Sequence, residues 1–115
     1  MVEVTGWISD VQENISIAII SELPAEIIDI SYPGEVLPNI SFQITCVVKN
    51  PNNAEYMMYA QILDNDGNRI AGTDLQHAVI QAGSTHQFTF VIPAQTGTSF
   101  DCVLDVGRIT DVNED

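Results

Sequence analysis

Residues 39–50 read Asn-Ile-Ser-Phe-Gln-Ile-Thr-Cys-Val-Val-Lys-Asn, and apolar side chains occupy alternate positions along this stretch. The intervening positions are polar, with Val47 as the exception. A period of two predicts a strand with one buried face. The next residues, 50–53, are Asn-Pro-Asn-Asn and end the strand, because asparagine favours turns and Pro51 cannot donate to a central ladder. An antiparallel β-sandwich is built around a core strand of this kind.

The same alternation recurs on the C-terminal side, with turn residues at intervals of about eight to twelve positions. Residues 64–68, Asp-Asn-Asp-Gly-Asn, carry the Asp-Gly signal of a hairpin. The last expected strand places Phe100, Cys102, Leu104 and Val106 on one face. We therefore predict an all-β antiparallel sandwich of about seven strands. Besides the strand from Ile40, the expected strands cover residues 26–31, 55–63, 74–80, 86–92 and 99–106.

The first 24 residues differ from this pattern and are interpreted as an N-terminal arm or added strand, with the sandwich domain at residues 25–115. Val2 and Val4 suggest a short extended piece. In residues 14–20, Ile15, Ile17 and Ile19 alternate with Asn, Ser and Ala, which favours a strand. A helix that begins at Ser9 is the competing interpretation, with Ile8, Val11, Ile15 and Ile19 on one face.

The charge balance is strongly acidic, with 16 aspartates and glutamates against three basic residues and a formal net charge of −13. Such a surface repels nucleic acid phosphates, so direct nucleic acid binding is not expected. The charge fits a solubility field, adaptation to high salt, or mimicry of a nucleic acid backbone. At the N-terminus the longest unbroken apolar run is residues 17–20, which is too short for a signal sequence, and no stretch of the chain approaches the roughly 20 apolar residues of a membrane span.

Four stretches of the chain together resemble a known domain type. They are Ile-Asp-Ile-Ser-Tyr-Pro-Gly-Glu-Val-Leu-Pro at 28–38, Phe-Gln-Ile-Thr-Cys-Val-Val-Lys-Asn at 42–50, Leu-Asp-Asn-Asp-Gly-Asn at 63–68 and Ile-Gln-Ala-Gly-Ser-Thr at 80–85. In these features residues 28–115 resemble the immunoglobulin-like domains of the CARDB type, which occur as repeats in bacterial and archaeal surface proteins. The resemblance covers about three quarters of the chain and implies an immunoglobulin-like sandwich.

The resemblance implies two further features. In its register Cys46 and Cys102 take positions similar to those of the immunoglobulin inter-sheet disulfide, although the third strand lacks the companion tryptophan. Domains of this type also continue into a last strand, whereas here the chain reaches Asp-Val-Asn-Glu-Asp at 111–115. We therefore expect an open strand edge, which the strand at residues 14–20 fills either within the chain or in a neighbour.

An apolar outer surface is a second sign of interaction. On the third strand the outward positions are Met57, Tyr59, Gln61 and Leu63, and Val103 is expected to share their face. Apolar patches on a highly charged protein usually mark an interaction site. The alternative interpretation is that the N-terminal segment covers this surface.

No residue constellation indicates catalysis, a cofactor or a bound metal. Asp64, Asp66 and Asn68 are spaced like the start of a calcium loop, but Gly67 comes too early and a hairpin turn explains them. His77 and His86 lack a third ligand, so surface positions are the simpler interpretation. The two cysteines form no zinc pattern.

These observations favour a non-catalytic structural or interaction module that forms a homo-oligomer or larger assembly through its arm. A virion component such as a capsid decoration or tail protein fits the small size and the acidic surface. An adhesion repeat of a cell-surface protein is the alternative, and an acidic inhibitor that mimics nucleic acid is the third hypothesis. The expected location is therefore a virion or an extracellular surface.

Overall fold

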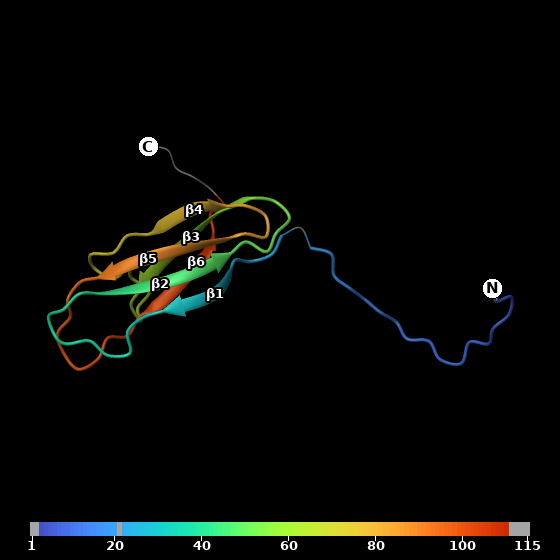
Figure 1. Cartoon of the computed structure of the whole chain (residues 1–115), viewed down its shortest axis with the longest axis horizontal. Coiled ribbons are helices and arrows are strands. Elements are labelled where there is room, and N and C mark those ends of the chain that lie inside the picture. Colours follow the sequence, from blue (N-terminus) through green and yellow to red (C-terminus); the bar gives the residue numbers. More distant parts are fainter. Residues whose placement is uncertain (1–2, 21, 111–115) are drawn as a thin grey trace.

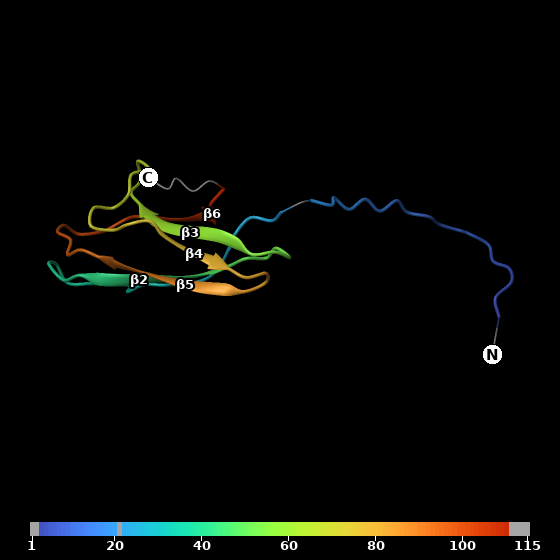
Figure 2. The ribbon, with the colours of Figure 1, turned by 90° about the horizontal axis from the view of Figure 1, so that it is seen from above.

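The computed structural model describes residues 3–20 and 22–110, and within these ranges it contains six strands and no helix. The strands form two three-stranded antiparallel sheets, ordered β1-β2-β5 and β4-β3-β6, which face each other (Figures 1 and 2). The prediction of an all-β, sandwich-like architecture is confirmed at this level. The bounds are β1 (Glu26–Ser31), β2 (Phe42–Lys49), β3 (Tyr56–Leu63), β4 (Gln76–Ile80), β5 (Thr85–Ile92) and β6 (Val103–Arg108).

Strand β2 is the central strand of its sheet and has the single buried face that its alternation predicts. It pairs with β5 without a register shift from Phe42 opposite Ile92 to Lys49 opposite Thr85. The strand begins two residues later than expected, at Phe42. The reason is local: Asn39 has a φ of 65°, a turn conformation that interrupts extended backbone, and Ile40 is exposed.

The core lies between the inner faces of the two sheets. The parity predicted for β3 is confirmed, because Met58, Ala60 and Ile62 point inward and are fully buried. Phe100 lies before β6 begins but contacts Phe42 edge to face, with ring centroids 5.7 Å apart. The buried apolar residues are Ile44, Cys46, Val48, Met58, Ala60, Ile62, Ile80, Phe88, Phe90 and Ile92.

The bounds of β4 and β6 differ from expectation by two residues or more, whereas the predicted hairpin turn is confirmed. The strand expected from residue 74 begins at Gln76, and the one expected at 99–106 runs from Val103 to Arg108. At the turn, Asp64 Oδ1 accepts hydrogen bonds of 2.9 Å from the backbone N–H groups of Asp66 and Asn68. The Asp64 carboxylate therefore stabilises the turn itself.

Within the single chain, residues 14–20 do not form the predicted strand, and the competing helix is absent as well. Residues 3–20 leave the body as an extended, exposed segment that forms no strand or helix (Figure 1). The described chain consequently measures 78 × 39 × 30 Å. A strand requires a neighbour for its backbone hydrogen bonds, and this segment lies beside none. The expectation for Val2 falls outside the described residues.

Candidate assembly site

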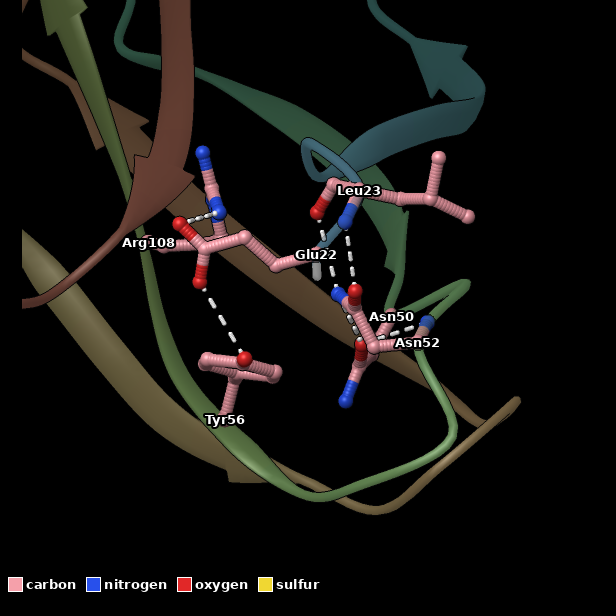
Figure 3. A network of polar contacts seen from close by, with 6 residues as sticks. All are labelled: Glu22, Leu23, Asn50, Asn52, Tyr56 and Arg108. Carbon is pink, nitrogen blue, oxygen red and sulfur yellow. Dashed lines mark hydrogen bonds and ion pairs between the residues drawn. The ribbon is translucent and has the colours of Figure 1, made fainter. Parts of the chain in front are cut away.

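The root of the arm is clamped to the sandwich by a reciprocal backbone contact. Asn52 accepts a hydrogen bond at Oδ1 from the Leu23 N–H, and its Nδ2 donates to the Leu23 carbonyl at 3.0 Å (Figure 3). One side-chain amide thus satisfies both backbone groups of Leu23, as a neighbouring strand would. This contact fixes the point at which the arm leaves the body.

The side chain of Asn50 positions Asn52 through hydrogen bonds. It is fully buried, and its Oδ1 accepts from the Asn52 N–H at 3.0 Å and from Asn52 Nδ2 at 2.9 Å. Its own Nδ2 donates at 2.8 Å to the carbonyls of Ala54 and Ile80. Sequence reasoning assigned residues 50–53 to a turn but missed this anchoring role, because the bond from Asn50 to the Ile80 carbonyl joins residues that are distant in the sequence.

An ion pair adds a second contact at the root. Glu22 Oε1 faces Arg108 Nη1 at the end of β6, and Glu22 Oε2 accepts a hydrogen bond of 3.1 Å from the Tyr56 hydroxyl (Figure 3). The hydrogen bond to the carboxylate raises the pKa of Tyr56 above its ordinary value. Arg108 Nη1 is buried and has no other partner among the described residues. The arm therefore starts beside the C-terminal end of β6.

Beyond this root the arm contacts no strand and exposes its apolar side chains. Ile15, Ile17 and Ile19 are 86%, 80% and 97% exposed. The interpretation that this segment covers the outer face of the sandwich is therefore wrong. The other large apolar side chains exposed on the arm are Val4, Trp7, Ile8, Val11 and Ile20.

The outer face of the β4-β3-β6 sheet carries the residues predicted as an interface, but polar groups divide them. Tyr59 donates from its hydroxyl to Asp105 Oδ2 at 3.1 Å, and Gln61 Nε2 donates to the same oxygen at 2.8 Å. Burial, together with the nearby Asp105 charge, raises the pKa of Tyr59. Leu63 lies opposite Val103 on one side of this cluster.

Met57 lies on the other side of the polar cluster, opposite Val79 on β4. Met57, Tyr59 and Leu63 are half-buried, whereas Val103 and Val79 are exposed. The expected apolar patch is therefore two separate cross-strand pairs. Tyr59 also covers Gly107, where an added Cβ would lie 2.9 Å from the ring. The sequence contained a signal for this division, because the polar residue Gln61 was expected to face outward among the apolar positions of the third strand.

A groove of about 760 Å³ opens between the two sheets near the end of β1 and the start of β6. Its walls come from these strands, from the β1–β2 connection and from the β5–β6 connection. Both sheets contribute apolar side chains to its lining, among them Ile30, Phe42, Ile44, Ile62, Phe100 and Leu104.

Cys102 lies on the wall of this groove, and both cysteines are free thiols. The disulfide that the resemblance implies is not formed. Cys46 is fully buried at the middle of β2, whereas Cys102 precedes β6 and is level with the beginning of β2. Burial is the main cause that raises the pKa of the Cys102 thiol, and the charge of Asp101 contributes.

The groove lies on the side of the sandwich where strand edges are open. Strands β4 and β5 approach each other on the opposite side, where the chain crosses from one sheet to the other. Among the described residues, β1 pairs only with β2, and β6 pairs only with β3. The expectation about the last strand rested on residues 111–115, which lie outside the described ranges.

The other candidate ligand residues do not lie close together. His77 on β4 and His86 on β5 are exposed and belong to different sheets, and His86 contacts the Phe88 ring at 4.7 Å between centroids. Residues 3–20 and 22–110 contain no group of three His, Cys, Asp or Glu side chains that could hold a metal ion. In the same ranges there is no helix that could span a membrane.

Comparison with known proteins adds no relative: the chain matches no family model, no curated protein and no solved structure. The class that the geometry itself defines is an all-β protein with two three-stranded sheets, a clamped arm and an open groove.

Proposed function

We propose that this protein is a non-catalytic structural module that assembles with other copies of itself through its N-terminal arm. Its strand order supports an immunoglobulin-like topology, since β1, β2 and β5 correspond to strands A, B and E, and β3 and β6 to C and F. In that topology the strand that follows F would lie on the open side of β6. A CARDB-type relationship remains part of this proposal.

The observation that carries the proposal is a fixed root followed by an exposed apolar arm. The clamp at Asn52 and Arg108 holds residues 22 and 23, so the arm leaves the body at a defined place. Eight large apolar side chains between Val4 and Ile20 remain in contact with water. Exposed apolar surface of this extent on an acidic protein is typical of an interaction element.

A rough balance of free energies indicates what the arm must contact. Ordering the seven residues 14–20 costs about 7–14 kcal/mol in backbone entropy. Complete burial of Ile15, Ile17 and Ile19 contributes only about 5–9 kcal/mol. The arm therefore needs an acceptor with apolar surface and unpaired backbone groups of its own. A folded copy of the chain provides both.

The role that suits such a module is a virion component, such as a capsid decoration or tail protein, or another extracellular surface layer. A rigid sandwich supplies a building block, the arm supplies the connection, and the net charge of −13 limits non-specific association. An adhesion repeat of a longer surface protein is the alternative role for the same fold.

Light scattering at several protein concentrations tests the proposal. We expect the full chain to form oligomers and a variant without residues 1–20 to be a monomer. The matched control combines Ile15→Ser, Ile17→Ser and Ile19→Ser, keeps the arm length and the root clamp, and should also be monomeric. A full chain that is monomeric at every concentration would contradict the proposal and direct attention to basic partners of the acidic surface.

A further inference from the structure

Within the described residues β6 has one open edge, and this edge has a definite hydrogen-bonding pattern. Ile109 donates its N–H to the Met57 carbonyl at 2.8 Å, which marks a hydrogen-bonded pair between β6 and β3 at the end of the ladder. Such pairs alternate in an antiparallel ladder, so the backbone groups of Leu104, Val106 and Arg108 point away from β3. They form a row of donors and acceptors that can pair with an added strand.

The arm contains a segment that matches this edge in length, period and charge. Residues 14–20 have no charged side chain, although the whole chain carries −13. A neutral strand can therefore approach another acidic copy without adding like-charge repulsion at the contact. In extended form its seven residues cover about 23 Å, which is close to the length of six-residue β6. Its three alternating isoleucines would all lie on the same face of the added strand.

The clamp decides which copy provides the strand. Glu22 is held beside Arg108, so an arm that folded back on its own body would run toward that end of β6, which is also the direction of β6. Self-insertion would therefore produce a parallel pair. An arm from another copy has no such constraint and can adopt the antiparallel arrangement, which is slightly more stable and continues the antiparallel sheet.

We propose that residues 14–20 of one copy add as an antiparallel strand to the open edge of β6 in a second copy. Ile19 then enters the groove beside the start of β6, and Ile17 and Ile15 continue along the same face of the added strand toward Arg108. This inference rests on the proposed function and specifies its interface. Each copy is both donor and acceptor, so reciprocal exchange between two copies closes a dimer, whereas one-way donation leads to rings or open chains.

The direction of the added strand determines which arm residue lies beside the Cys102 thiol, and disulfide formation can therefore test it. The antiparallel direction places Ile19 near the start of β6, beside the Cys102 thiol on the groove wall, and Ile15 near Arg108. A parallel strand would reverse these positions. Cys46 is fully buried and offers no competing thiol.

The experiment introduces Ile15→Cys, Ser16→Cys or Ile19→Cys separately into the full chain. Oxidised glutathione serves as the oxidant: it accepts the two electrons of each disulfide formed and becomes reduced glutathione. We expect Ile19→Cys to form covalent dimers and higher multiples on a non-reducing gel, and Ile15→Cys to form several-fold fewer. Ser16→Cys is the matched control, because its side chain would point away from the groove. On the same non-reducing gel this variant should run as a monomer.

Adding Cys102→Ser to Ile19→Cys should abolish the multiples. If they persist, arms are linked to arms, and the proposed docking is overturned. A disulfide within one chain in Ile15→Cys would overturn it in favour of self-insertion. An arm-dependent oligomer with no bond to Cys102 would overturn the docking site but leave the proposed function standing, whereas loss of the arm-dependent oligomer would remove both.

Discussion

At the scale of single residues, two asparagines determine where the arm begins. Asn50 is a fully buried polar side chain that satisfies partners in its own turn, at Asn52 and Ala54, and at Ile80 at the end of β4. Buried polar groups of this kind stabilise a fold only while every partner remains satisfied. Asn52 then applies the same chemistry to Leu23, so the position of the arm depends on a network that is buried in the sandwich.

Replacing Asn50 should therefore destabilise the whole sandwich. We expect Asn50→Ala to reduce the free energy of unfolding by about 2–4 kcal/mol, because buried donors and acceptors lose their partners. Urea denaturation of the variant without residues 1–20 measures this loss without interference from assembly. Asn53→Ala, at an exposed neighbouring position, is the control and should change stability by less than about 0.5 kcal/mol. Equal effects at both positions would contradict the anchoring role.

At the scale of elements, the arm and β6 are complementary because each has backbone groups without a strand partner. Within the described part of the chain, residues 3–20 form no backbone hydrogen bond and β6 leaves one edge open. An isolated extended segment is not stable as a strand, since its backbone groups are satisfied only by water. The strand predicted for residues 14–20 thus requires an acceptor edge in order to exist.

Hydrogen exchange should reveal this change of state. In dilute protein, where monomers dominate, we expect amides of residues 3–20 to exchange without protection and the Leu23 amide to be protected by Asn52. At high concentration, alternate amides within residues 14–20 should become protected as the donor strand forms. Asn52→Ala should remove protection at Leu23 under both conditions. If only the amides of residues 4–13 became protected at high concentration, the donor strand would lie in that part of the arm and not at residues 14–20.

At the scale of the whole molecule, assembly has to overcome electrostatic repulsion. Copies that carry −13 each repel one another, and dissolved salt screens this repulsion over distances of about 10 Å at 0.1 M. The docking segment itself is neutral, so added salt weakens the repulsion without weakening the attraction between arm and groove.

We therefore expect oligomers to become more populated as sodium chloride rises from about 0.05 M to about 0.5 M. Analytical ultracentrifugation at fixed protein concentration measures the change. The variant that carries serine at positions 15, 17 and 19 should remain monomeric at both salt concentrations. Dissociation of the full-chain oligomers at high salt would show instead that ion pairs hold the copies together.

The sequence alone determined the features that depend on consecutive residues. Alternation in β2 and β3 predicted which side chains enter the core, and the Asp64 turn followed from its own local hydrogen bonds. These features were predictable because a strand's two faces and a tight turn are encoded within a few neighbouring positions.

Tertiary structure alone decided the state of the arm, the anchoring role of Asn50, the interruption of the outer apolar surface and the free thiols. Each depends on which distant backbone or side chain lies alongside. Residues 14–20 have the pattern of a strand, but a strand is completed only by a partner, and local periodicity contains no information about where that partner is.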